Sequence, residues 1–327
     1  MATAQSWLVT GGAGFIGSHL VEALLAGGHR VTVLDDLSTG SRANLAAVEE
    51  NPRLRIIESK VSGYAGLGEL VDGMDGVYHL AAAVGVELVV RSPIRTIQTN
   101  LDETEAILAA VSRRKVPVLV ASTSEVYGKS LKEEFSEEDD LLIGPPHLGR
   151  WSYACSKLMD EFLGLAYARE RGLPVVIARI FNTVGPRQTG RYGMVLPRFI
   201  AAAQAGHPLR VFGDGRQTRC FCYVGDTVTA LRLLLEGPAA RGQVVNVGGT
   251  REVTILDLAR QVISAVGATS SIEFVSYDEA YAPGFEDMQR RRPATGKLLC
   301  LTGFQPSVSL EEIIRRTAGA GAVQRLS

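Results

Sequence analysis

The sequence predicts an α/β protein built on a doubly wound parallel sheet, with a smaller C-terminal lobe. Short runs of Val, Ile and Leu alternate with longer helical patterns up to Ile180. Several runs are continuous in apolar residues, as expected where both faces of a parallel sheet are covered. A glycine-rich turn joins the first run to the first helical pattern. After Ile180 the pattern loosens into loops punctuated by glycine, which marks the lobe.

The runs and helical patterns form repeated strand–helix–strand units, for which right-handed crossovers are expected. The predicted strands are Trp7–Thr10, Arg30–Leu34, Leu54–Ile57, Val77–Leu80, Val116–Ser122 and Pro174–Ile180. The predicted helices are Phe15–Ala26, Ala43–Glu50, Pro93–Arg113, Ser152–Arg171, Met194–Gly206, Ile255–Val266 and Leu310–Thr317. A late strand, Val244–Val247, is expected to return to the sheet.

These elements divide the chain into two parts. Residues 1–180 form the sheet domain, to which residues 218–250 partly return, and residues 181–217 and 251–327 form the lobe. The last residues, from Gly319 onward, are small and polar, so we expect them to fray.

Composition excludes several classes of protein. The 327 residues carry 34 Lys+Arg and 35 Asp+Glu, a net charge of −1, so nucleic acid is not expected as a partner. Four cysteines are too few for a disulfide framework and lack zinc-like spacing, so no metal is expected. No apolar run approaches the roughly 20 residues that span a bilayer, and no signal segment begins the chain. We expect a cytoplasmic protein that does not bind membranes.

The turn after the first strand has the spacing Gly11-x-x-Gly14-x-x-Gly17. One glycine permits the tight turn, one lets the backbone approach a pyrophosphate, and one packs helix against strand. The following helix begins at Phe15 and Ile16, and its N-terminus offers amide groups and a positive dipole to phosphates. These five residues therefore predict a dinucleotide site in a Rossmann-type domain.

The second strand ends in Asp35-Asp36. An acidic residue about 20 positions after the glycines suits the hydroxyls of an adenosine ribose, whereas it would repel a 2′-phosphate. The pair therefore favours NAD over NADP.

Tyr153 and Lys157 lie four residues apart at the start of a predicted helix, so both can face one cleft. A nearby ammonium lowers the pKa of a phenol, which would let Tyr153 act as a general base near neutral pH. Thr123 and Glu125 follow the fifth predicted strand, at the sheet edge where ligands of doubly wound proteins bind. These four residues are the candidate catalytic group.

The chain resembles the extended short-chain dehydrogenase/reductases that modify nucleotide sugars. The matching stretches occur in the order of the family and cover most of the chain. They are Thr10–Gly17, His79–Ala82, Ser122–Gly128, Tyr153-x-x-x-Lys157, Arg179–Pro186, Gln217–Arg219 and Arg290–Pro293.

The resemblance implies a role for each matching residue. Thr123 would hydrogen-bond the C4 hydroxyl of the sugar, Tyr153 would take its proton, and Lys157 would bind the nicotinamide ribose. Binding of NAD would extend to Leu80, Ala81 and Ala82. Asn182, Arg219 and Arg291 would hold the diphosphate of the substrate, and Phe212 would lie against its base.

One departure from the family concerns adenine. Relatives often carry Gly-Asp-Val after the third strand, with the Asp at the adenine amine. This chain has Ser59-Lys60-Val61, which leaves the adenine contact unassigned.

Oxidation at C4 can lead to three different reactions. A 4,6-dehydratase needs an acid that protonates the leaving C6 hydroxyl. Dehydratases have Asp at the position where this chain has Ser124. Thr123-Ser124-Glu125 and Gln217-Thr218-Arg219 resemble the UDP-glucuronate decarboxylases, the UDP-xylose synthases. Ala83–Glu87 looks more like the 4-epimerases.

Arg187 and Arg191 are candidates for binding a sugar carboxylate. Such a cation suits both reactions of a uronic acid, decarboxylation and 4-epimerisation. We therefore expect a UDP-glucuronate decarboxylase. A 4-epimerase of UDP-glucuronate or of a UDP-hexose is the alternative, and a non-catalytic NAD-binding protein is a remote one. Relatives pair helices into a homodimer, for which Pro93–Arg113 and Ser152–Arg171 are the candidates.

Overall fold

The computed structural model describes residues 3–83, 92–189, 194–276 and 288–320. At its centre is a seven-stranded sheet in the order β11-β6-β5-β4-β1-β2-β3. All of its neighbouring strands are parallel. The strands are β1 (Ser6–Thr10), β2 (Arg30–Asp35), β3 (Leu54–Glu58), β4 (Gly76–His79), β5 (Val118–Thr123), β6 (Val175–Ile180) and β11 (Gln243–Val247).

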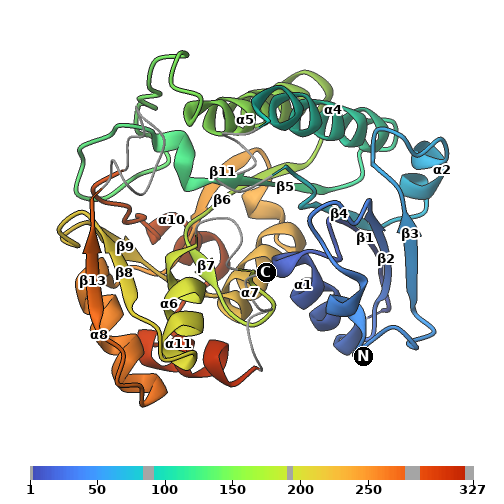
Figure 1. Cartoon of the computed structure of the whole chain (residues 1–327). Helices are drawn as coiled ribbons and strands as arrows, with labels where there is room; N and C mark the ends of the chain where they lie inside the picture. Colours follow the sequence, from blue (N-terminus) through green and yellow to red (C-terminus); the bar gives the residue numbers. More distant parts are fainter. Residues whose placement is uncertain (1–2, 84–91, 190–193, 277–287, 321–327) are drawn as a thin grey trace.

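The order of the strands reverses between β1 and β4, so the sheet is doubly wound, as the sequence predicts (Figure 1). Strand β11 joins β6 at one edge, which confirms the predicted return of the late strand. Ligands of such sheets bind beyond the carboxyl ends of the strands, next to the reversal.

Helices cover both faces of the sheet (Figure 1). Trp7 and Val9 point to one face and Leu8 to the other, the period of two expected for a strand. The first face packs against α1 (Phe15–Ala26), α7 (Val224–Glu236) and α10 (Gly296–Thr302). The second packs against α2 (Leu67–Asp72), α4 (Pro93–Ser112) and α5 (Trp151–Arg171).

The lobe has its own apolar core. Three helices enclose it: α6 (Val195–Gln204), α8 (Ile255–Val266) and α11 (Leu310–Gly319). Its short strands pair in twos: β8 (Leu209–Phe212) with β13 (Ile272–Val275), β9 (Thr218–Cys220) with β12 (Glu252–Thr254), and β7 (Thr183–Val184) with β10 (Cys222–Tyr223).

Two parts of the fold differ from the prediction. The predicted helix Ala43–Glu50 is a 3₁₀ helix, η1 (Arg42–Leu45), followed by turns. Backbone bonds three residues apart replace the α-helical ones, and the Asn44 side chain donates to the Ala13 carbonyl instead of facing solvent. Helix α7 was not predicted. It buries Val228 and Leu231 against the sheet. These residues form an apolar stripe at helical spacing, which is the usual sequence pattern of an amphipathic helix.

Some predictions fall outside the described residues. These are Arg191, the Val84–Glu87 part of the epimerase-like segment, and the frayed end from residue 321 onward. Among the helices that the structure describes, none is long and apolar enough to cross a bilayer.

Candidate active site

The glycine turn has the geometry that the spacing predicts. Gly11 has φ +68°, a left-handed conformation that favours glycine. A Cβ on Gly17 would collide with the Gly11 carbonyl oxygen, so this glycine lets α1 pack against the turn. Among the described residues, a Cβ on Gly14 would meet only the Gly11 oxygen, at 3.1 Å, so no other residue in that part of the chain packs against this side of the turn. Gly14 is also the N-cap of α1 and makes no side-chain capping bond.

The loop after β4 lies directly against this turn. The Ala81 amide donates to the Thr10 hydroxyl at 3.2 Å, and a Cβ on Gly11 would touch Ala81. Asn100 of α4 holds this loop at Ala83, whose amide donates to the Asn100 side chain at 2.7 Å. The predicted residues Leu80, Ala81 and Ala82 are thereby brought to the glycine turn.

Asp35 also supports the turn. Its carboxylate accepts the amides of Ala13 and Leu37, each at 2.9 Å. Burial raises the pKa of the Asp35 carboxyl, and these two amide bonds oppose the shift. Asp36 accepts the amide and the hydroxyl of Ser38.

Lys60 lies at the edge of a pocket formed with the first half of α4. The amides that follow it, at Val61 and Ser62, both donate to the buried carboxylate of Glu103. The loop that carries Lys60 is thus attached to α4 by Glu103.

Tyr153 and Lys157 lie one turn apart on α5, and the Tyr153 hydroxyl is hydrogen-bonded to Thr123. Thr123 is the last residue of β5 and the N-cap of a 3₁₀ turn, η2 (Ser124–Tyr127), where its oxygen accepts the Glu125 amide at 3.2 Å. The sheet edge and the helix thereby bring the predicted catalytic residues together.

The pKa of Tyr153 differs from the sequence-based prediction. Burial, Glu125 and Asp160 raise the pKa of the Tyr153 phenol, and the bond from Thr123 lowers it. Lys157 does not offset this rise, because its ammonium lies 2.7 Å from the Asp160 carboxylate. The predicted lowering of this pKa is therefore wrong, because the protein groups around Tyr153 raise it.

Glu125 is surrounded by arginines. Its carboxylate lies 2.6 Å from Arg291 and 3.3 Å from Arg150, and both arginine side chains are buried or nearly so. Although burial opposes ionisation, Arg291, Arg150 and Arg219 together hold the pKa of Glu125 below its usual value. Glu125 is thus an anion among three cations, beside Tyr153.

Arg150 was not among the predicted site residues. It lies three residues before Tyr153, at the N-cap of α5, so the spacing argument that groups Tyr153 with Lys157 also extends to it. This helical spacing from Tyr153 is the signal by which the sequence could have indicated Arg150 as a site residue.

A buried polar network lies behind the strand end that carries Thr123. The Glu161 carboxylate of α5 accepts hydrogen bonds from the guanidinium of Arg179 and from the hydroxyl of Ser122. Arg179 also lies over the Tyr127 ring, with 4.8 Å to its centroid. These bonds join β5, β6, α5 and η2, and they fix the segment that presents Thr123 and Glu125.

The remaining predicted substrate residues are not all gathered at Glu125. Asn182 donates to the Cys220 carbonyl at 3.1 Å, and the Phe212 ring packs under Arg198 in the lobe. Arg219, in contrast, is buried and acts on Glu125, as does Arg291.

Arg187 lies away from the predicted carboxylate site. Its guanidinium binds both carboxylate oxygens of Glu22, the Asn44 carbonyl and His19. These partners lie on α1 and in η1, so Arg187 attaches the loop after β7 to the sheet domain. This placement does not support the predicted contact with a sugar carboxylate.

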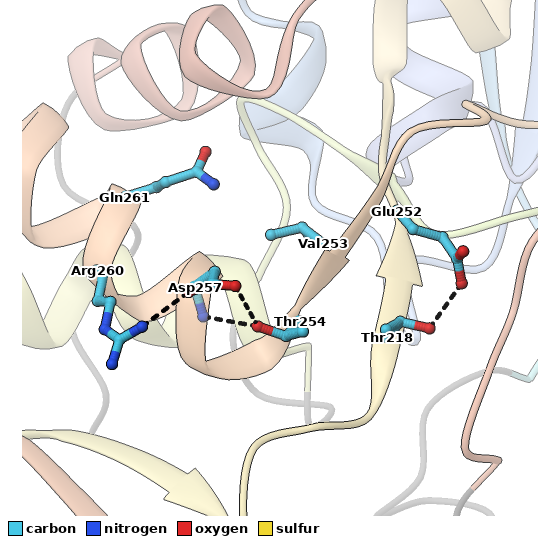
Figure 2. A pocket seen from close by; sticks show the side chains of 7 residues that line it. All are labelled: Thr218, Glu252, Val253, Thr254, Asp257, Arg260 and Gln261. Carbon is cyan, nitrogen blue, oxygen red and sulfur yellow. Dashed lines mark hydrogen bonds and ion pairs between the residues drawn. The ribbon is translucent and has the colours of Figure 1, made fainter.

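Figure 2 shows a pocket in the lobe, between β9, β12 and the start of α8. Its polar side chains bind one another: Thr218 donates to Glu252, and Thr254 and Arg260 donate to Asp257. None of the predicted site residues that the structure describes lines it. We therefore place the candidate active site at Tyr153 and Glu125.

The motifs that surround this site match a known family. The family model described as "NAD dependent epimerase/dehydratase family" matches residues 7–248, which include the glycine turn, Thr123 and Tyr153. The chain belongs to this family. NAD is therefore its cofactor, and the protein is an enzyme of the epimerase/dehydratase group.

Curated relatives of this family member match it over nearly the whole chain. The UDP-N-acetyl-alpha-D-glucosaminuronate decarboxylase of Bacillus cytotoxicus is 42% identical over 311 residues, 95% of either chain. UDP-glucuronic acid decarboxylase 1 of Xenopus tropicalis is 37% identical over 95% of this chain and 70% of its own.

A solved structure gives a second comparison. The UDP-glucuronic acid 4-epimerase of Bacillus cereus, in complex with UDP-glucuronic acid and NAD, matches with a TM-score of 0.85 and 31% identity. The match covers 96% of this chain and 98% of that one.

The residues of this chain fit NAD. In the part of the chain that the structure describes, only Gly11 packs against the side of Gly14 where a Cβ would stand, and α1 begins there without a side-chain cap, so its first amides can face a pyrophosphate. The Asp35 carboxylate lies at the end of β2, where an adenosine ribose is expected.

Proposed function

We propose that this protein is a UDP-hexuronate decarboxylase, with UDP-glucuronate as the substrate that the sequence favours. The observation that carries the proposal is the ionised Glu125 among Arg291, Arg150 and Arg219, next to the bonded pair Thr123 and Tyr153. Three guanidinium groups act on this one carboxylate. Planar guanidinium groups suit the oxygens of a substrate with both a diphosphate and a sugar carboxylate.

The first step is oxidation at C4 of the sugar. Tyr153 takes the proton of the C4 hydroxyl, and Thr123 orients that hydroxyl. When bound, the nicotinamide supplies the acceptor for the C4 hydride, and its positive charge favours the Tyr153 phenolate that the site alone disfavours.

The second step is loss of the C6 carboxylate. The C4 ketone makes the sugar a β-keto acid, so the C5–C6 bond breaks and its electron pair moves to the C4 oxygen as an enolate. Tyr153, now protonated, and Thr123 both face that oxygen and can donate to it. A proton then returns to C5, and re-reduction at C4 would give the UDP-pentose, UDP-xylose in the case of UDP-glucuronate.

Ser124 supports decarboxylation over 4,6-dehydration. It is almost completely buried beside Thr123, and its hydroxyl is a poor acid for a leaving hydroxide. The decarboxylase relatives favour loss of carbon dioxide, and the epimerase structure makes 4-epimerisation the second candidate.

Product analysis with two substrates tests the proposal. The protein and NAD⁺ are incubated with UDP-glucuronate and, in parallel, with UDP-N-acetylglucosaminuronate. The name of the 42% identical relative makes the latter the second candidate substrate. Mass spectrometry should show a loss of about 44 mass units, since carbon dioxide leaves. A product of unchanged mass with inverted C4, seen by NMR, would replace the proposal with 4-epimerisation.

We also propose that two copies pair through α4 and α5, which lie side by side (Figure 1). Both helices expose large apolar side chains: Ile94 is 72% exposed, Phe162 62% and Met159 54%. Exposed apolar groups on neighbouring helices are typical of an interface between subunits.

The cytoplasmic location expected from the sequence stays a prediction.

Substitution of this surface should separate the copies. Ile94→Glu combined with Phe162→Glu places charges in the apolar contact, so light scattering should give half the mass of the wild type. Leu131→Glu, at a loop residue that is 94% exposed, is the control and should leave the mass unchanged. A monomeric wild type would contradict the pairing.

A further inference from the structure

Lys157 is buried together with a carboxylate that the proposed mechanism does not use. The Lys157 ammonium lies 2.7 Å from Asp160, and their side chains are 3% and 0% exposed. Asp160 lies three residues after Lys157 on α5, so the pair forms within one helix. A buried charge without a partner is strongly destabilising. Burial raises the pKa of the Asp160 carboxyl, whereas Lys157 and the hydrogen bond with Thr104 oppose that rise and favour the ionised form, so Asp160 supplies the counter-charge here.

The other groups around this pair do not replace Asp160. His79 of β4 faces Lys157, but burial lowers the pKa of His79 to about 3, so the imidazole is neutral. Its two nitrogens are hydrogen-bonded to Thr10 and to Thr104 of α4. Glu161, the next acid on α5, binds Arg179 instead.

We propose that Asp160 is a positioning residue that holds the Lys157 ammonium and that its charge sets the pH at which Tyr153 releases its proton. Asp160 acts through Lys157 and does not need to touch the substrate. This inference rests on the proposed role of Tyr153 as the base in C4 oxidation.

The direction of the effect follows from the charges that face the pair. Asp160 and Glu125 are the nearby anions that raise the pKa of Tyr153. A nearby negative charge disfavours the phenolate. Removal of the Asp160 charge should therefore make loss of the Tyr153 proton easier.

The pH profile of substrate oxidation tests the charge effect. Asp160→Asn keeps the shape of the side chain, and the acid limb of kcat/KM should move to lower pH by about one unit. Asp160→Glu keeps the charge and should keep the limb near that of the wild type. The control Asp102→Asn, at an exposed acid of α4, should not move it. An unmoved limb in Asp160→Asn would overturn the proposal.

Thermal unfolding tests the pairing without substrate, even where Asp160→Asn yields too little folded protein for kinetics. In the Lys157→Met background the Asp160 carboxylate loses its partner, so adding Asp160→Asn should raise Tm. In the wild-type background the same substitution should lower Tm or prevent folding. A fall of Tm in both backgrounds would show that Asp160 does not act through Lys157. Because this comparison needs no turnover, it stands even if no UDP-hexuronate is a substrate.

Discussion

Tyr153→Phe should slow hydride transfer strongly while leaving the fold and NAD binding intact. The substitution removes the hydroxyl that is bonded to Thr123 and keeps the ring. Loss of a positioned general base costs about 10²–10⁴-fold in rate. We therefore expect exchange of the C4 hydrogen of the substrate with bound nicotinamide to fall by that factor. Deuterium at C4, followed by NMR, measures the exchange.

A tyrosine further along the same helix provides the control. Tyr167 of α5 packs under Arg171, away from Thr123, so Tyr167→Phe should leave the exchange rate near that of the wild type. Stabilisation by NAD in a thermal shift assay should be retained in both variants. Full exchange activity in Tyr153→Phe would show that another group is the base.

The alternation of apolar runs and helical patterns was sufficient to predict the sheet. Val175–Ile180 and Gln243–Val247 are strands in which apolar residues dominate, and both were predicted within a residue or two. The segment from Ala43 failed because its apolar spacing is helical, whereas its backbone forms successive short turns under the Gly14 loop. Tertiary contacts decided that conformation, and they are not a local property of the sequence.

The candidate site was predictable where its residues share one element. Tyr153 and Lys157 were paired by helical spacing, and the same spacing places Arg150 and Asp160 on that face of α5. Arg187 shows the limit of such reasoning. Its partner Glu22 lies 165 residues away in the chain, and no local pattern indicates that the two side chains meet.

Glu125→Gln should separate C4 oxidation from decarboxylation. The substitution removes the negative charge that occupies Arg291 and Arg150 and keeps the shape of the side chain. The freed guanidinium groups would then hold the substrate carboxylate more tightly in the ground state, which slows its departure. We expect release of carbon dioxide to fall by about 10²-fold, and KM to fall or stay unchanged. Exchange at C4 should persist, because loss of the Glu125 charge favours the Tyr153 phenolate.

Carbon dioxide from C6-labelled substrate and exchange of C4 deuterium are measured in the same sample, so that both steps are compared at equal enzyme concentration. Glu134 provides the control, since it forms an ion pair with Arg292 at the surface, 3.4 Å apart. Exposed ion pairs contribute little, so Glu134→Gln should leave both rates within about twofold of the wild type.

The wild-type pH dependence gives a further check. The arginines hold the pKa of Glu125 below its usual value, so its charge should persist in mild acid. The ratio of carbon dioxide release to C4 exchange should therefore not fall at the pH where an ordinary glutamate takes up its proton, although both rates fall as Tyr153 becomes protonated. Equal loss of both steps in Glu125→Gln would instead assign Glu125 to the structure around Tyr153.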